Sequence, residues 1–199
     1  MCGRYYVEPE ENAAEMQRIL EDLNHRYPDS KLLPMMHLGE ILPSQIAPVM
    51  ANSKSLTARP FLMKWGYAAE HRPLIINARS ESALEKPLFR ESMQTRRCLI
   101  PVNRYFEWQK TPEAKLKYAI SLDQQPIFYM AGIYRLESGQ ELPSFVILTC
   151  DAADEIKFIH PRMPVILPRE QQVAWLDPTA DVKNILAAAH SKMTYQKSS

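Results

Sequence analysis

The spacing of apolar residues predicts one long helix near the start of the chain. Four apolar residues between Met16 and Leu23 recur at the i, i+3, i+4 and i+7 positions of a single helix face. Pro9 suits the first turn of such a helix, and Pro28 would end it. We therefore predict a helix over residues 9–27.

Apolar and alternating runs predict strands through most of the remaining chain. Turn residues separate these runs, and regular helices do not alternate with them, which is typical of mostly antiparallel pairing. The pattern therefore indicates an α+β fold. The predicted strands cover residues 46–50, 59–67, 73–77, 98–100, 103–109, 118–122, 126–134, 144–150 and 163–167.

Shorter helices and a polar tail complete the predicted organisation. No Gly/Ser-rich or charge-rich linker divides the chain, so we expect one domain over residues 1–190. Residues 191–199 form a polar C-terminal tail, which is expected to fray. The further helices are predicted at residues 87–97, 151–159 (with Asp151 as N-cap), 168–175 and 182–189.

The balance of charges narrows the functional classes. The chain has 24 Lys and Arg residues against 23 Asp and Glu residues, which gives a formal net charge of +1. A protein that binds long duplex DNA through its overall electrostatic field usually has a larger positive net charge. Any contact of this chain with DNA must therefore be local. Hydrophobic residues make up 46% of the chain, which suffices for a well-buried core.

Cysteine and histidine usage argues against several kinds of site. The three cysteines are an odd number without a CxxC pair, which disfavours a disulfide framework and a structural zinc site. The histidines show no ligand spacing, so we expect no metal and no other cofactor. The chain shows no secretory signal and no apolar run of membrane-spanning length, so we expect a cytoplasmic protein.

Cys2 is the first candidate for chemistry because of its position. Removal of the initiator methionine would leave a free 1,2-aminothiol, whose amine and thiol have reference pKa values of about 7.7–8.0 and about 8.5. The amine can form an imine with an aldehyde, and the adjacent thiol can then close a five-membered thiazolidine. The alternative is an incidental cysteine at a frayed terminus.

Glu107 and His160 are candidate proton carriers. Alternation along a strand places Glu107 and Tyr105 on one face, and a carboxylate among aromatic side chains suits a general acid. A solvent-facing strand glutamate is the alternative. His160 begins the stiff segment His160–Pro164 and can carry a proton, or it is a loop histidine packed for its shape.

The segment Asn77–Glu81 combines groups that recognise nucleic acid. An amide and a guanidinium at a strand end can bind a sugar oxygen and a phosphate, although a turn and a helix start are also consistent with it. Arginines mixed with aromatic residues suit a groove for single-stranded nucleic acid, and they are also ordinary composition. These residues are Arg4, Arg79, Arg96, Arg97, Arg104 and Arg162, with Tyr5, Trp65, Tyr67, Phe89, Tyr105 and Trp108.

Taken together, short segments along nearly the whole chain resemble the SOS response-associated peptidase (SRAP) family. Their ordered occurrence, with a cysteine directly after the initiator methionine, makes this resemblance specific. The matching segments are residues 1–4, 43–45, 65–66, 77–81, 97–101, 107–108, 131–132 and 160–164.

The resemblance implies a compact fold with barrel-like β structure surrounded by helices. It also implies self-removal of Met1 and covalent capture of abasic sites in single-stranded DNA through a thiazolidine at Cys2. By matching motifs, Asn77 positions the adduct, Glu107 is the acid/base for ring opening and imine formation, and His160 moves a proton during closure and reversal. The implied DNA contacts are Arg4, Trp65, Arg79 and Arg162.

Two other functions would use part of the same set of residues. A cysteine peptidase or amidohydrolase would use Cys2 as an N-terminal nucleophile, with its own amine as base. A noncatalytic module would only bind single strands. Our expectation is a cytoplasmic monomer that joins the nucleoid when it binds single-stranded DNA containing abasic sites, with no membrane and no protein partner implied.

Overall fold

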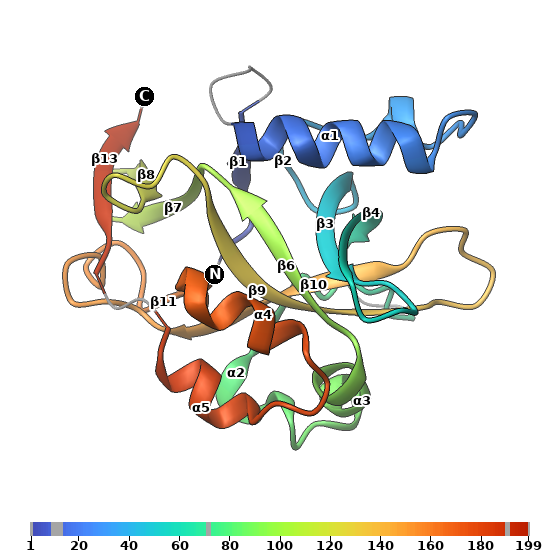
Figure 1. Ribbon diagram of the computed structural model, residues 1–199. Helices are drawn as coiled ribbons and strands as arrows, with labels where there is room; N and C mark the ends of the chain where they lie inside the picture. The colour runs from blue at the N-terminus through green and yellow to red at the C-terminus, as the bar shows by residue number, and fades with distance from the viewer. Residues whose placement is uncertain (1, 9–13, 71–72, 190–191, 199) are drawn as a thin grey trace.

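Five strands pair in a closed ring (Figure 1). They are β3 (Ile46–Asn52), β4 (Ala58–Trp65), β6 (Arg97–Val102), β9 (Phe128–Arg135) and β10 (Ser144–Asp151). The hydrogen-bonded order is β10–β4–β3–β6–β9, and β9 pairs again with β10 to close the ring. In this computed structural model, which describes residues 2–8, 14–70, 73–189 and 192–198, the β4–β10 pair is parallel and the other four pairs are antiparallel.

Short strands extend the ring where β10 ends. Strand β5 (Asn77–Arg79) pairs with β10 in parallel, and β11 (Arg162–Pro164) pairs with β10 in antiparallel fashion. Strand β12 (Ile166–Leu167) pairs with β9. The last residues of β10 therefore lie between the strand of Asn77 and the strand of Arg162.

A second, five-stranded sheet carries the start and the end of the chain. Its order is β13–β8–β7–β1–β2. One residue separates β6 from β7, so the chain passes directly from the ring into this sheet. The strands are β1 (Tyr5–Val7), β2 (Gly39–Ile41), β7 (Arg104–Lys110), β8 (Lys115–Ser121) and β13 (Thr194–Ser198).

Helices cover the β structure (Figure 1). Helix α1 (Ala14–Arg26) packs against β4 and buries Met16, Ile19 and Leu23, which belong to its predicted apolar face. Among the others, α3 packs on β9 and α4 on β6. They are η1 (Leu33–Met35), α2 (Ser80–Ala83), α3 (Pro87–Thr95), α4 (Arg169–Leu176) and α5 (Val182–Ala187).

The predicted α+β class, with mostly antiparallel barrel-like β structure surrounded by helices, is confirmed. Residues 9–13 of the first predicted helix lie outside the described residues. The predicted strand at 73–77 is displaced, because only an isolated bridge at Ile75 precedes β5. Within the described residues, no helix combines the length and the apolar character that crossing a membrane requires.

Two local predictions are wrong. Residues 151–159 form no helix: Asp151 ends β10, and the following turns hold bonds such as Ile156 N–H to the Ala153 carbonyl, which span three residues instead of four. The tail is not frayed over Thr194–Ser198, because these residues pair with β8 as strand β13.

At two positions in the segments that resemble the family, the backbone geometry or its close neighbours leave room only for glycine. Gly132 lies in the ring between β6 and β10, where an added Cβ would sit 2.5 Å from Ile100 Cδ1 and 3.0 Å from the Val146 carbonyl oxygen. Gly66 has φ of +108°, which an L side chain rarely adopts. Both positions therefore serve the closure of the ring rather than chemistry.

Candidate site around Cys2

Cys2 is held inside the molecule by its backbone. The Asn77 side-chain amide donates a hydrogen bond of 2.9 Å to the Cys2 carbonyl oxygen. The Phe106 N–H donates to the Arg4 carbonyl oxygen at 2.9 Å, which continues the β1–β7 pairing towards Cys2. The Cys2 side chain is fully buried. The alternative of a frayed terminus is therefore wrong for Cys2.

Asn77 is positioned by the strands around it. It starts β5 and pairs with Ile147 of β10. The carbonyl of the preceding Ile76 accepts a hydrogen bond of 3.0 Å from the Trp65 indole N–H. The Oδ1 atom of Asn77 is buried and has no hydrogen-bond partner in the part of the chain that the structure describes. The side chain thus anchors Cys2 with its donor and presents an acceptor to the site.

Trp65 takes a packing role in place of the predicted DNA contact. It is fully buried, and its ring stacks on Phe145 with 6.3 Å between centroids and 8° between planes. The Tyr5 ring lies 5.0 Å from it. Because Trp65 contacts both Tyr5 of β1 and Ile76, it fixes the two segments that carry Cys2 and Asn77. Its ring offers no surface to a base.

Glu107 is buried beside Cys2, and the solvent-facing alternative is wrong. Its side chain is only 5% exposed, and its neighbour on the same face of β7, Tyr105, is fully buried. Burial raises the pKa of the Cys2 thiol strongly, and the negative charge of Glu107 raises it further. Burial also raises the pKa of Tyr105, to which the charges of Cys2 and Glu107 contribute. These three side chains therefore share one poorly solvated environment.

His160 lies in the turn that follows β10. Its Nδ1 atom accepts a hydrogen bond of 3.0 Å from the Arg162 backbone N–H and lies 3.1 Å from the Arg162 carbonyl oxygen. Phe158, in the same turn, contacts the Tyr118 ring at 5.7 Å. Tyr118 is the cross-strand neighbour of Glu107. The turn that holds His160 therefore packs against β8, the strand that pairs with the Glu107 strand β7.

Arg162 already has its charge balanced within the protein. Its guanidinium donates to Glu81 at 2.5 and 2.9 Å, to Asp151 at 2.7 Å and to the Thr149 carbonyl at 2.7 Å. The hydrogen bonds from Arg162 lower the pKa of Glu81. This network ties β11 to β10 and α2, and it orients the His160 turn from its C-terminal side.

Arg4 and Arg79, the other two arginines predicted to contact DNA, differ in whether their charge is already paired within the protein. Arg4 is paired with Glu40 and lies over the Trp108 ring, 5.2 Å from its centroid. Arg79 is exposed at the end of β5, two residues after Asn77, and forms no ion pair with another described residue. Arg79 is therefore the freest of the predicted phosphate contacts.

Sequence reasoning named Trp108 only among the aromatic residues of a groove for single-stranded nucleic acid, and it gave Glu81 no role of its own. Trp108 is half-buried beside Arg4, on the opposite face of β7 from Glu107, and it fits a contact with a base better than Trp65 does. Its position directly after Glu107 in a matching segment was the available signal. The pairing of Glu81 with Arg162 spans 81 residues, so no local pattern could reveal it.

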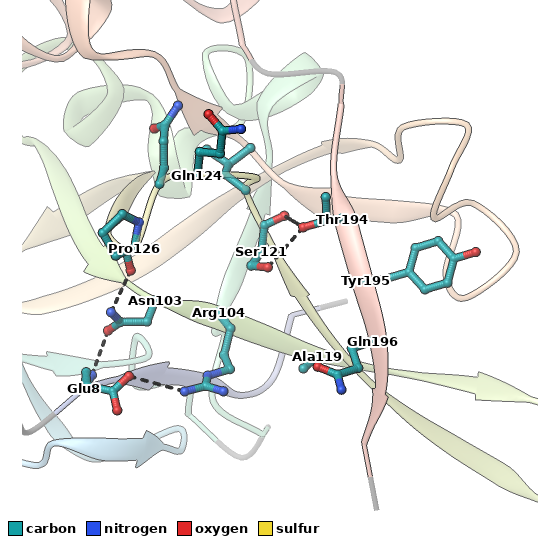
Figure 2. Close-up of a pocket in the computed structure, with 12 residues that line it drawn as sticks. Glu8, Asn103, Arg104, Ala119, Ser121, Gln124, Pro126, Thr194, Tyr195 and Gln196 are labelled. Carbon is teal, nitrogen blue, oxygen red and sulfur yellow. Dashed lines mark hydrogen bonds and ion pairs between the residues drawn. The ribbon is translucent and has the colours of Figure 1, made fainter.

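The described residues contain no group of three His, Cys, Asp or Glu side chains that could hold a metal ion. A cavity of about 760 Å³ lies elsewhere, on the outer side of the five-stranded sheet (Figure 2). It is lined by polar residues such as Arg104, which pairs with Glu8 at 3.3 Å. Cys2 and Glu107 are not among the residues that line this cavity.

Fold and site together define a small β-barrel protein with a buried cysteine at position 2, beside an amide and a carboxylate. The family described as "SOS response associated peptidase (SRAP)" matches residues 1–198. The chain belongs to this family.

Relatives in bacteria and vertebrates support this membership. The chain is 31% identical over 190 residues to "Abasic site processing protein YoqW" of Bacillus subtilis, with 89% of this chain and 81% of that protein covered. It is 35% identical over 116 residues to YedK of Escherichia coli, covering 56% of this chain and 52% of that protein. For HMCES of Xenopus tropicalis the identity is 28% over 137 residues, with 55% and 41% covered.

Solved structures show the same fold. A protein from Bacteroides thetaiotaomicron superposes with a TM-score of 0.77 at 24% identity, and the match covers 98% of this chain and 91% of that one. A phage-related protein from Bordetella bronchiseptica gives a TM-score of 0.73 at 26% identity, with 99% and 94% covered.

Proposed function

We propose that this protein captures abasic sites in single-stranded DNA by forming a thiazolidine with the amine and thiol of Cys2. The observation that carries the proposal is the hydrogen bond from Asn77 to the Cys2 carbonyl, next to the buried carboxylate of Glu107. The names of YoqW and YedK, both abasic site processing proteins, support the choice of substrate.

The chemistry needs no cofactor. The Cys2 amine adds to the C1′ aldehyde of the open abasic sugar, and loss of the aldehyde oxygen as water gives an imine. The thiol sulfur then bonds to C1′, and the nitrogen of the ring gains a proton. The net result is one C–N bond, one C–S bond and one released water. Both nucleophiles belong to one residue, so the second attack is intramolecular and strongly favoured.

The environment of Cys2 suits this order of steps. Because its pKa is raised, the thiol stays protonated at neutral pH and must give up its proton as sulfur attacks. Glu107 is the neighbouring carboxylate and takes the role of acid for dehydration and base for the thiol. His160 exchanges a proton with the C4′ oxygen of the sugar, which becomes a hydroxyl when the sugar ring opens to the aldehyde and closes back onto C1′ after reversal.

The amine exists only once Met1 has been removed. While the Met1–Cys2 peptide bond is intact, the Cys2 nitrogen is an amide and cannot form an imine. Hydrolysis of this bond consumes one water and releases methionine and the free aminothiol. We include self-removal of Met1 in the proposal, with the Cys2 thiol as nucleophile, since an internal nucleophile of this kind is an established route to peptide hydrolysis.

DNA is proposed to reach the site as a single strand. Arg79 neutralises a phosphate beside Asn77. Trp108 of β7, with the Arg4 guanidinium over its ring, offers an aromatic and cationic contact. Arg162 acts indirectly, by holding the His160 turn against β10. A full duplex would keep the abasic sugar inside the stack, so a single strand should react faster.

The test is incubation with an oligonucleotide containing one abasic site, followed by a denaturing gel. The wild-type chain, shown by mass spectrometry to begin at Cys2, should give a stable shifted band. Cys2→Ala should give none, although borohydride would trap an imine formed by its amine. Cys150→Ala, which removes a half-buried thiol outside the site, serves as the matched control and should crosslink normally.

The same experiment separates the alternatives. A cysteine peptidase would leave no shifted band and would cleave a peptide, and a binding module would do neither. A stable band from Cys2→Ala without reductant would contradict the thiazolidine, and full activity of a chain that retains Met1 would contradict the need for a free amine.

A further inference from the structure

Three aromatic rings meet on the surface next to the candidate site. They belong to Tyr118 of β8, Phe158 of the turn after β10, and Tyr195 of β13, and we call them the aromatic trio. The three centroid distances are 5.7, 5.9 and 5.2 Å, and every pair meets edge to face. Phe158 is 46% exposed and Tyr195 is 47% exposed. The rings thus hold one another in place while two of them present apolar surface to solvent.

The aromatic trio continues directly from the site residues. Tyr118 is paired with Glu107, so their side chains leave the sheet on the same face. Tyr195 is paired with Ile120, two residues further along β8, and shares that face. Tyr195 is also one of the residues that line the cavity with Arg104 and Ser121, but Figure 2 shows its ring pointing away from these two side chains.

The position of Phe158 in the chain also connects the aromatic trio to the candidate site residue His160. Phe158 precedes His160 by two residues, and the backbone of this turn is closed by the bond from Ala152 N–H to the Pro161 carbonyl. A strand of DNA whose abasic sugar lies at Cys2, beside Glu107, is therefore placed to meet the aromatic trio with its next nucleotide.

We propose that the aromatic trio is a stacking platform for the unpaired base that flanks the abasic residue. This inference rests on the proposed function. An abasic residue interrupts the stack, so the flanking base lacks a neighbour on one side, and an aromatic face replaces that neighbour whatever the base. Because the rings already fix each other, little conformational entropy is lost on stacking. The platform would hold the strand in register with Cys2.

The test uses binding without covalent chemistry. Two short fluorescent oligonucleotides carry a stable tetrahydrofuran residue in place of the abasic sugar; its neighbours are thymidines in one and further tetrahydrofuran residues in the other. Neither has an aldehyde, so neither can crosslink. Wild type should bind the thymidine-flanked strand roughly 5- to 150-fold more tightly, measured by fluorescence anisotropy.

Variants assign this preference to the rings. Phe158→Ala and Tyr195→Ala should each bring the ratio of the two dissociation constants towards one, and Phe158→Tyr should keep it. Leu136→Ala is the control: Leu136 is 69% exposed in the turn between β9 and β10, which projects on the opposite side of the molecule from β13 (Figure 1). It should retain the wild-type ratio.

Failure of this inference is distinct from failure of the proposed function. A wild-type ratio of one, no measurable binding of either strand, or an unchanged ratio in both alanine variants would overturn the platform. Such a result would show that the rings only fasten β13 to the sheet, and their removal would then lower the melting temperature alone. Crosslinking of an aldehyde-bearing strand, scored separately, tests the proposed function.

Discussion

The side-chain amide of Asn77 donates a 2.9 Å hydrogen bond to the main-chain carbonyl of Cys2, across 75 residues of sequence. The protein thereby holds Cys2 by its backbone, and this contact leaves the nitrogen and sulfur atoms of Cys2 unengaged. Any loss of the Asn77 donor should disturb the orientation of the aminothiol more than the stability of the fold.

Asn77→Ala should slow crosslinking by roughly 10²-fold, since small displacements of a reacting group have effects of this size. The loss of one hydrogen bond should lower the free energy of unfolding by only about 1 kcal/mol. Asn52→Ala is the matched control, because Asn52 donates an equivalent 2.9 Å bond to the Leu176 carbonyl. Equal crosslinking rates in the two variants would remove the positioning role of Asn77.

Glu107→Gln should reduce the rate of crosslinking by roughly 10²- to 10⁴-fold, the usual contribution of general acid–base catalysis, if chemistry limits the rate. The amide keeps the shape of the side chain but cannot exchange a proton. Glu91→Gln, at an exposed position on α3, controls for the loss of a carboxylate. A time course on the gel gives both rates, and a Glu107→Gln rate equal to wild type would assign Glu107 to packing.

His160→Gln should slow formation of the adduct less than Glu107→Gln does, and it should change reversal. His160 is proposed to exchange a proton with the C4′ oxygen of the sugar, which is freed when the sugar ring opens and is recaptured when that ring re-forms after reversal. Release of the purified adduct onto a competitor oligonucleotide measures reversal. If release matched wild type in a variant shown by circular dichroism to be folded, the histidine would be excluded from the chemistry.

Arg79→Ala should weaken binding of single-stranded DNA and lower the slope of log affinity against log salt by about 0.7, the value for one phosphate contact on a single strand. The effect should not depend on base sequence. Arg59→Ala controls for net charge, because Arg59 lies on β4 and pairs with Asp22 of α1. Anisotropy titrations at several salt concentrations give the slope, and an unchanged slope in Arg79→Ala would exclude a phosphate contact.

The free energy of unfolding should fall as the pH rises above about 9. Burial raises the pKa of Cys2 and Cys98 from an ordinary value of 9.0, and that of Tyr5 and Tyr105 from 10.0. In the unfolded chain these groups ionise at their ordinary values and release protons, whereas the folded chain retains them. Their contribution is therefore complete below pH 9 and is lost at higher pH, at about 1.4 kcal/mol per pH unit for each group.

Urea unfolding at a series of pH values from 7.5 to about 10.5 measures this loss. Cys98→Ala, which removes one of the buried thiols without touching the site, should make the decline above pH 9 shallower by about 1.4 kcal/mol per pH unit. A free energy that stayed constant over this range would contradict the shared burial of these groups.

The sequence predicted the class of fold because its strongest patterns are local. Strands β9 and β10 are continuous apolar runs, and α1 has apolar residues at helical spacing. Each pattern indicates which side chains are buried and can be read within a few residues. Strand β13 escaped prediction because it is a polar edge strand, stabilised by pairing with β8 rather than by an apolar face. The helix predicted after Asp151 failed because the pairing of β10 with β11 forces the chain into a tight return.

The site was predicted in part, for a physical reason. Alternation on β7 correctly grouped Glu107 with Tyr105 but could not say which face is buried, since that depends on strands far away in sequence. Trp65 was placed in the DNA groove because an aromatic ring suits both stacking on bases and packing in a core. Only the tertiary contacts of Trp65 with Phe145 and Ile76 separate the two.

The pairing of β1 with β7 and the bond to Asn77 also determine when the surroundings of Cys2 can form during synthesis. Cys2 is among the first residues to leave the ribosome, but Glu107 follows 105 residues later, which takes roughly 5–20 s at ordinary rates of synthesis. Cys2 lacks Asn77 for the first 75 residues of this interval and lacks Glu107 throughout it. A nascent or unfolded chain therefore carries Cys2 without the buried surroundings that the folded protein gives it.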